Sequence, residues 1–380
     1  MKKILNIISL TVLLFTPVFS YGTAEKLDAF IEKVTLTIQE NDTDSFNNLF
    51  NMNIYADRII EQLDYNDRTK KEYKKIFLKE KDKLINNIFL QTFYNGDAQI
   101  KFKKTEIRDR RKSLNYRVIG PDSAVIFIEM ILAKGKNNNY EIIDFYTLDS
   151  GDYLSNVASQ AILLMDPKRN VFESFLDISK VDSKIIDNFL TLSKNYRNGQ
   201  YNKAYLSYLQ LPIEFKKEPV IARLGTQITI NLSDDIYLKH LSFIDENFSN
   251  DPSFSMALID YHFMNDDLDS AIKNLHLLND TVGSDAYVLH LISTTYGLLN
   301  DFGNQLTFAQ QAIDLEPELL YAHFALLDYY IMSADYVNAI KTLIVLNKQF
   351  DDYVLKSDLI AEPSYAGFVN SEVFKLHFAE

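Results

Sequence analysis

The sequence predicts an α+β domain, in which helices pack on a curved antiparallel sheet, followed by an all-α array of stacked helical hairpins. Two patterns predict this order. In the first part of the chain, up to position 150, the spacing of apolar residues changes from a helical period to a period of two. In the second half, Asp267, Asp301 and Asp335 recur with a 34-residue period, which is typical of helical arrays. The length of the chain is sufficient for two parts of this size.

Residues 1–20 have the three regions of a secretory signal. Lys2 and Lys3 are basic, residues 4–15 form an apolar run, and a stretch with small residues ends at Ser20. The run is shorter than the roughly 20 residues that span a bilayer as a helix, so we expect cleavage after residue 20, or alternatively after residue 22 or 24. The chain contains no cysteine, which excludes a lipid-modified cysteine at the new N-terminus. We therefore expect a periplasmic protein that touches membranes only peripherally.

Residues 24–165 form the predicted α+β domain. Apolar side chains at helical spacing predict one helix at 27–38 and one long helix at 73–89, which carries lysines on its other face. Alternating residues then predict strands, with turn residues between them, near 100–102, 114–118, 124–132 and 140–148. Strands that follow one another through short turns form a meander, so the sheet should be antiparallel.

Helices followed by such a sheet, which closes with Tyr140–Phe145 and then Gly151–Asn156, resemble the NTF2-like (cystatin-like) fold. The closing stretch is similar to periplasmic lipid carriers of the toluene-tolerance type. The resemblance implies a pocket between the sheet and the helices. Five strand residues are candidates to line it: Tyr116, Glu129, Tyr140, Asp144 and Tyr146. We favour ordinary core packing for the three tyrosines.

The two carboxylates among these candidates lie in apolar strands. Such a group faces water, is paired with a cation, or is desolvated with a raised pKa that suits acid–base chemistry. The domain contains no histidine and no evident nucleophile beside a base, so we expect water or a partner for Glu129 and Asp144. The phosphate-binding glycine loops and the serine and zinc motifs of common enzyme classes do not occur in the sequence. We therefore expect no enzyme activity, no metal and no cofactor.

Residues 180–353 form the predicted array. In the unit at 286–319, one apolar helix face precedes the turn at Asp301, and a second apolar stripe follows it. Similar units are predicted at 252–285 and 320–353, whereas residues 188–211 and 234–247 keep the rhythm less well. A hairpin of this size buries its apolar face only by stacking on its neighbours. The terminal segment at 354–380 should cap the array.

Two turns share a small residue, a polar residue, tyrosine and, three residues after the tyrosine, alanine: Gly199–Ala204 and Ala334–Ala339. With the 34-residue period, this pattern resembles the tetratricopeptide repeat (TPR) family, although Gln305 stands where the family has alanine. The resemblance implies that the first helix of each hairpin lines a groove for a protein or peptide. The matching positions are Met256, Asp260, Phe263, Met264, Tyr287, His290, Thr294, Tyr321, Phe324, Asp328 and Met332. For Phe263 and Phe324, packing within the protein is the alternative.

The charges restrict the partner. The net charge is −13, and residues 161–380 hold 30 acidic and 16 basic side chains. Such a surface repels nucleic acid and favours an apolar or cationic partner, although a solvated acidic exterior that keeps the array soluble explains the charge equally well. The densest basic run, from Lys101 to Arg117, is consistent with a charged sheet edge, or with docking to acidic repeats or anionic lipid.

Together these features predict an exported, non-catalytic interaction scaffold that binds a protein or peptide in the groove of its repeats. The alternative is a periplasmic carrier or sensor of an apolar small molecule or lipid, which would bind in the NTF2-like domain.

Overall fold

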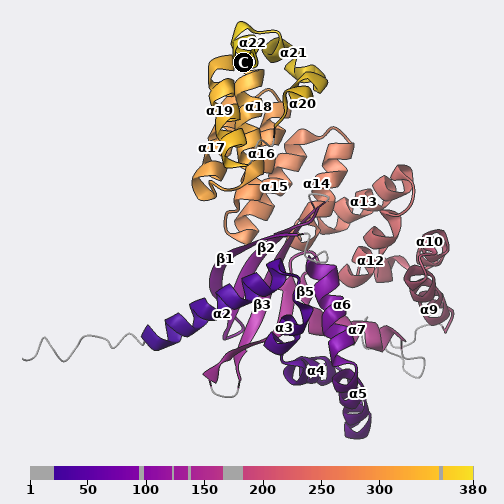
Figure 1. The fold of residues 1–380 in the computed structure, drawn as a ribbon. Coiled ribbons are helices and arrows are strands. Elements are labelled where there is room, and N and C mark those ends of the chain that lie inside the picture. The colour runs from indigo at the N-terminus through magenta and orange to yellow at the C-terminus, as the bar shows by residue number, and fades with distance from the viewer. Residues whose placement is uncertain are drawn as a thin grey trace, which may run out of the picture. The chain divides into compact units, whose positions relative to one another are not determined.

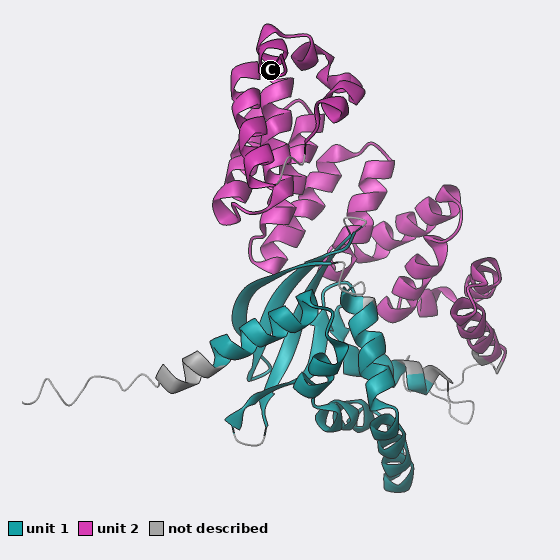
Figure 2. Ribbon diagram, in the orientation of Figure 1, with its two compact units in different colours: residues 1–163 teal, residues 164–380 magenta. Residues whose placement is uncertain are grey.

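The computed structural model describes residues 21–93, 98–121, 124–135, 138–165, 183–350 and 354–379. The chain divides into two compact units, residues 1–163 and 164–380 (Figure 2). The predicted secretory signal lies outside the described residues. Among the helices of the described residues, none is both long enough and apolar enough to cross a membrane.

The first unit combines helices with one antiparallel sheet, as predicted (Figure 1). Its helices are α2 (Tyr21–Gln39), α3 (Thr43–Leu49), α4 (Met52–Glu61), α5 (Asp67–Lys79), α6 (Lys81–Phe93) and α7 (Leu154–Met165). Its strands lie in the sheet in sequence order: β1 (Gln99–Arg108), β2 (Arg111–Ile119), β3 (Val125–Lys134), β4 (Tyr140–Thr147) and β5 (Asp152–Tyr153). Every neighbouring pair is antiparallel, which confirms the meander. Asp109 and Arg110 form the turn between β1 and β2, and both have the positive φ that a two-residue hairpin turn requires.

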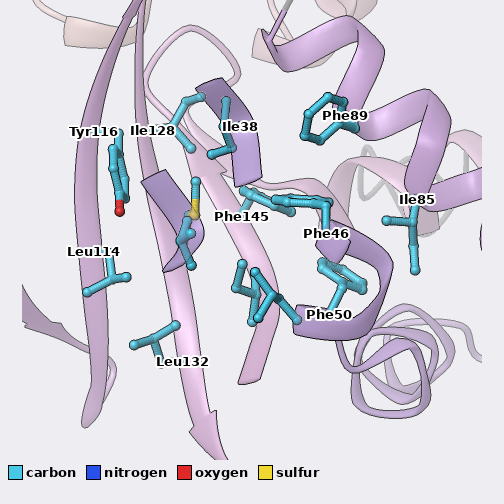
Figure 3. Close-up of a cluster of buried hydrophobic side chains, with 14 of the residues drawn as sticks. Ile38, Phe46, Phe50, Ile85, Phe89, Leu114, Tyr116, Ile128, Leu132 and Phe145 are labelled. Atoms are coloured by element: carbon cyan, nitrogen blue, oxygen red, sulfur yellow. The ribbon is translucent and has the colours of Figure 1, made fainter. Parts of the chain in front are cut away.

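One face of the sheet and the helices that cover it form the core of this unit (Figure 3). Alternate residues of β2 and β3 point into it, including Tyr116 and Met130, and both side chains are buried. The ring of Phe46 in α3 lies 5.0 Å from that of Phe89 in α6 and 6.2 Å from that of Phe145 in β4. Aromatic side chains therefore occupy the space between sheet and helices.

The predicted long helix at 73–89 is wrong in one respect, because the structure divides it into α5 and α6 at Glu80. Tyr73 in α5 stacks on Tyr65, with ring centroids 5.6 Å apart, whereas Phe89 in α6 lies in the core beside the sheet. The two halves bury their apolar sides against different partners. Tertiary packing thus overrides a continuous helical period.

The second unit consists of helices that pack consecutively along the chain, as predicted for an all-α array (Figure 1). Among its described residues, five pairs form helical hairpins: α9 (Ser183–Arg197) with α10 (Tyr201–Leu209), α12 (Pro219–Thr229) with α13 (Asp234–Phe248), α14 (Ser255–Met264) with α15 (Leu268–Val282), α16 (Ala286–Leu298) with α17 (Phe302–Leu315), and α18 (Leu320–Met332) with α19 (Tyr336–Gln349). The short elements α11 (Ile213–Lys216) and η4 (Pro252–Phe254) lie between hairpins.

The aspartates at the 34-residue spacing lie at the hairpin turns, as predicted. Asp267, Asp301 and Asp335 are the N-caps of α15, α17 and α19, and each carboxylate accepts a hydrogen bond from the backbone N–H three residues later. The residue before each aspartate has a positive φ, and the N–H of the aspartate bonds to the carbonyl five residues earlier. In the two upstream hairpins, Gln200 and Ser233 hold the N-cap position without a side-chain hydrogen bond. The helical hairpins continue in this part of the array, but their second helices begin without a side-chain cap.

Gln305 takes the buried position that Ala271 and Ala339 hold in the neighbouring hairpins. Gly297 in the first helix makes room for it, because a Cβ atom at Gly297 would lie 2.7 Å from Nε2 of Gln305. The hydroxyl of Ser293 donates to the backbone oxygen of Gln305 at 2.7 Å. A glycine across the hairpin therefore compensates for the departure from the alanine pattern.

The residues after the last hairpin pack on it. They form α20 (Lys356–Ala361), η5 (Pro363–Tyr365), α21 (Ala366–Val369) and α22 (Glu372–His377). Phe368 and Phe374 are buried in the same apolar cluster as Leu343 and Leu346 of α19. The segment therefore covers apolar surface that α19 would otherwise expose.

Candidate functional site

Asp144 is fully buried in the first unit, and both oxygens of its carboxylate have donors. One extra residue in β4 shifts the register beside Asp144. Oδ2 accepts hydrogen bonds from Arg58 Nε at 2.5 Å and from the Ser155 hydroxyl at 2.6 Å. Oδ1 accepts from the backbone N–H groups of Phe145 and Ser155. Burial raises the pKa of Asp144, while the bonds from Ser155 and Arg58 act in the opposite direction.

Glu129 is paired in the same way. Its carboxylate accepts two hydrogen bonds from the Arg108 guanidinium, one of them from Nε at 2.6 Å. The Arg108 guanidinium lies 4.2 Å from the ring centroid of Tyr146, and that of Arg58 lies 4.8 Å from the ring centroid of Tyr153. The two tyrosine rings pack edge to face at 5.8 Å. Both carboxylates, with their arginines and tyrosines, thus form one connected cluster.

The five predicted pocket residues divide between the two faces of the sheet. Tyr116 and Tyr140 lie in the core with the helices. Glu129, Asp144 and Tyr146 alternate with core residues of β3 and β4, so they lie on the opposite face. These three belong to the arginine cluster, in which cations compensate both carboxylates.

Sequence reasoning missed the partners of these carboxylates. Arg58 is the only cation in α4, among residues that are mostly buried. The helix also carries Asp57 and Glu61, so its sequence does not point to a distant buried carboxylate as the partner of Arg58. Nothing in the sequence around Ser155 marks it as the second donor. In the predicted basic run, Lys104 pairs with Glu106 at 2.5 Å, so part of that run serves pairing within the sheet.

The second unit presents a regular row of exposed apolar side chains at the C-terminal ends of the first helices. Its members are Ile230, Met264, Leu298 and Met332, which follow one another at the 34-residue spacing, and each lies three residues before the N-cap position of the second helix. These residues are 58%, 40%, 58% and 44% exposed. Equivalent positions of successive hairpins follow one another along an array, so we call the four residues the apolar ridge.

Only two members of the apolar ridge, Met264 and Met332, were predicted as groove residues. Leu298 and Ile230 were missed, although the 34-residue spacing leads directly from Met264 to both. Thr294 is exposed, while Met256 and Phe263 are half-buried.

A second row lies four residues earlier in the first helices and holds Thr226, Asp260, Thr294 and Asp328. Asp260 is exposed, and its carboxylate accepts a hydrogen bond of 3.4 Å from the hydroxyl of Tyr237 in α13. The residue is exposed as a whole, but neighbouring protein atoms displace water from the carboxyl group of Asp260. This desolvation raises the pKa of Asp260. Asp328 is less exposed and accepts a hydrogen bond from the hydroxyl of Tyr365 in η5. Burial raises the pKa of Asp328 to about 6, against the effect of this bond.

Three predicted groove residues pack on one another near the N-terminal ends of α16 and α18. The ring of Tyr287 lies 4.9 Å from that of His290 and 5.2 Å from that of Tyr321, and His290 stacks on Tyr321 at 5.4 Å. Tyr287 is buried, whereas His290 and Tyr321 are half-buried. Phe324 is also half-buried, against the apolar cluster of the last hairpin. These rings therefore join neighbouring hairpins, whereas the ridge residues of the same helices are exposed.

The first helices α14, α16 and α18 contain no lysine or arginine. Residues 252–353 hold 14 acidic side chains and three basic ones, and the three lysines lie on second helices. Met264, Leu298 and Met332 of the ridge therefore lie on helices without lysine or arginine, whereas α12, which leads to Ile230, carries Arg223. Within the described part of the chain, no group of three histidine, aspartate or glutamate side chains could hold a metal ion.

No protein family model matches the chain, and no curated protein is significantly similar to it.

Proposed function

We propose that the chain is an exported, non-catalytic scaffold that holds a protein or peptide partner against the first helices of its second unit. The apolar ridge is the observation that carries this proposal. Single exposed apolar residues are ordinary, but here one recurs at the same place in four successive hairpins, and two of the four, Leu298 and Met332, lie on helices that pack directly on each other. A partner that covers it gains about 25 cal/mol for each Å² of apolar area removed from water.

The state of the two carboxylates in the first unit supports binding over catalysis. Asp144 and Glu129 are the two candidates that the sequence offers for acid–base chemistry, and each is engaged by an arginine. The arginines occupy oxygens that a substrate proton would have to reach, and the Asp144 side chain has no exposed surface.

In this proposal the array is of the TPR type and the first unit is NTF2-like. The capped turns at a 34-residue spacing and the buried alanines at 204, 271 and 339 support the first assignment. Helices on one face of an antiparallel meander support the second. A carrier function has less support, because the rings of Phe46, Phe89 and Phe145 occupy the space between sheet and helices.

Affinity capture from the cell of origin tests the proposal. The double variant Leu298→Lys, Met332→Lys places charge on the ridge, and Ile344→Lys, Val345→Lys places the same charge on exposed apolar positions of α19. We expect a partner that the ridge variant loses and that the α19 variant retains. Equal capture by both variants would contradict the proposal. Export is tested separately by fractionation and N-terminal sequencing, for which we expect a first residue at position 21, 23 or 25 in the periplasm.

A further inference from the structure

We propose that the tip of the hairpin formed by β1 and β2 docks on a bilayer surface that contains anionic lipid. The docking tip comprises Ile107, Arg110, Arg111 and Lys112. In the docked state, the three cations contact lipid phosphates and the isoleucine side chain enters the layer beneath them. This site belongs to the first unit, so it does not depend on the partner surface of the second unit.

The docking tip combines an exposed apolar side chain with exposed cations. Ile107 is 76% exposed, more than any other large aliphatic side chain of the described residues. Lys112 lies directly across from it in the hairpin, so their Cβ atoms are about 5 Å apart. Arg110 and Arg111 are exposed in the turn and at the start of β2. An apolar side chain beside several cations suits the boundary between anionic headgroups and acyl chains.

Contacts within the unit engage the acidic side chains near the docking tip but not its cations. Among the described residues of β1, β2, β3 and the turn between the first two strands, the acidic residues are Glu106, Asp109 and Glu129. Their partners are Lys104, the hydroxyl of Tyr153 and Arg108, respectively. No described carboxylate forms an ion pair with the three cations of the docking tip. The positive charge of the docking tip is therefore available to an external anion.

The same contacts fix the turn in place. Arg108, directly before the turn, bonds to Glu129 on β3, and Tyr153 on β5 donates to Asp109 within the turn. Two further strands thus hold the turn, and the docking tip is preformed. A preformed surface loses less conformational freedom when it docks.

Protection of the sheet edge does not account for these cations. Charged residues on an edge strand discourage pairing with another chain, and this applies to the lysines of β1. Strand β2 lies between β1 and β3, so Arg111 and Lys112 belong to an inner strand. Arg111 lies across from Arg108, a like-charge pair that weakens a hairpin. Arg110 has a φ of 64°, a conformation that glycine adopts with less strain. The hairpin therefore keeps its cations at a cost in stability, which is common at functional sites.

A lipid surface fits the docking tip better than a protein partner does. The tip is far smaller than a specific protein interface, which uses about 20–30 residues on each side. A bilayer needs no matching shape, and each cation near an anionic surface strengthens binding about fivefold. Three cations together favour an anionic over a neutral surface by on the order of 100-fold.

Vesicle sedimentation tests the proposal with the protein purified from its own cells, so that any processing of the N-terminus has taken place. Vesicles of phosphatidylcholine alone are compared with vesicles that contain about 30% phosphatidylglycerol. The triple variant Arg110→Gln, Arg111→Gln, Lys112→Gln removes the cations of the docking tip. The matched control is Lys71→Gln, Lys75→Gln, Lys79→Gln, which removes the same charge from three exposed lysines of α5 in the same unit.

We expect the native protein to bind the anionic vesicles at least tenfold more tightly than the neutral ones, and more weakly as salt rises from about 50 to about 200 mM. The triple variant should lose at least tenfold in affinity, and the α5 control less than threefold. Ile107→Ser should weaken binding about threefold to tenfold. Leu376→Ser, at a side chain of α22 that is 72% exposed, should leave binding unchanged.

A fluorescent substitution reports on the isoleucine position directly, because the chain contains no tryptophan. For Ile107→Trp, we expect the emission to shift to shorter wavelength with anionic vesicles, and brominated lipid to quench it. Leu376→Trp is the control for the effect of adding an indole ring, and its emission should not change.

Equal binding to neutral and anionic vesicles would overturn the proposal, as would equal losses in the triple variant and the α5 control. Unchanged emission of Ile107→Trp in the presence of anionic vesicles would overturn the insertion of this side chain and with it the docking tip. Association of two copies without vesicles, lost in the triple variant, would assign the docking tip to an acidic surface of a second copy and reject the lipid surface. None of these measurements involves the apolar ridge, so a failure here is distinct from a failure of the proposed function.

Discussion

Asp260 and Asp328 hold the same position in two hairpins, two repeat periods apart, and each carboxylate accepts a hydrogen bond from a tyrosine outside its own hairpin. Tyr237 comes from the second helix of the preceding hairpin, and Tyr365 comes from the segment after the last one. In the hairpin between them, the position is Thr294, which is exposed. The repeat therefore provides a polar row beside the ridge, and the C-terminal segment engages one end of it.

The first prediction concerns the pH dependence of stability at Asp328. Burial raises its pKa to about 6, above the value near 3.8 of an unfolded aspartate. A raised folded-state pKa gives stability that is fully present below about pH 4 and lost as the pH rises through about 6. Asp328→Asn does not ionise, so we expect it to be more stable than the native protein at pH 7, by on the order of 1–2 kcal/mol, and not at pH 4. Denaturant unfolding at both pH values, followed by far-UV circular dichroism, measures the difference. A gap of the same size at pH 4 would contradict the assignment to this carboxyl group.

The second prediction concerns the caps of the second helices. Asp335→Ala removes the acceptor for the backbone N–H of Asn338 and should lower the free energy of unfolding by about 1 kcal/mol. Gln200→Ala is the matched control, because Gln200 holds the same position without a side-chain hydrogen bond. We expect it to change stability by less than about 0.5 kcal/mol. Losses of equal size would show that the cap is not the cause.

The third prediction concerns Ala334, which has a φ of 59° directly before that cap. An alanine is strained in the left-handed region, whereas glycine adopts it readily. Ala334→Gly should therefore stabilise the protein by about 0.5–1 kcal/mol, despite the greater freedom of glycine in the unfolded chain. Gly199, at the corresponding turn, has a φ of 66°, and Gly199→Ala should destabilise. Thermal unfolding of both variants tests the pair, and shifts of the same sign would be inconsistent with it.

The fourth prediction concerns the buried ion pair of the first unit. Arg58→Met leaves the charge of Asp144 buried without its cation and should cost about 3–5 kcal/mol. The double variant Arg58→Met, Asp144→Leu removes both charges and should recover most of that loss. Hydrogen exchange of the β4 amides reports on this unit directly. If the double variant exchanges as fast as Arg58→Met alone, the unpaired charge is not what destabilises the single variant.

The fold class was predictable because two patterns can be read directly from the sequence. These are the period of two in the strands of the first unit and the 34-residue period of the aspartates in the second. Asp267, Asp301 and Asp335 marked the turns correctly, since a cap needs a particular side chain. The break at Glu80 was not predictable, because α5 and α6 keep one helical period and only their different packing partners separate them.

Less of the candidate site was predictable. The pairs Arg58 with Asp144 and Arg108 with Glu129 join residues 86 and 21 positions apart, and nothing local specifies such contacts. Leu298 was within reach of the sequence, because it lies one period after Met264. It was missed because an exposed leucine at the end of an apolar helix has the same local pattern as a buried one.

Site-specific photo-crosslinking in the cell of origin tests the central claim most directly. A photoreactive residue is placed at Leu298 on the ridge and, in a second protein, at Ile344 on α19, which is similarly exposed. We predict one discrete adduct with a partner protein from position 298, which disappears when Met332→Lys is added, and none from position 344. Identical adducts from both positions, or no adduct from position 298, would contradict the claim that the ridge holds a partner.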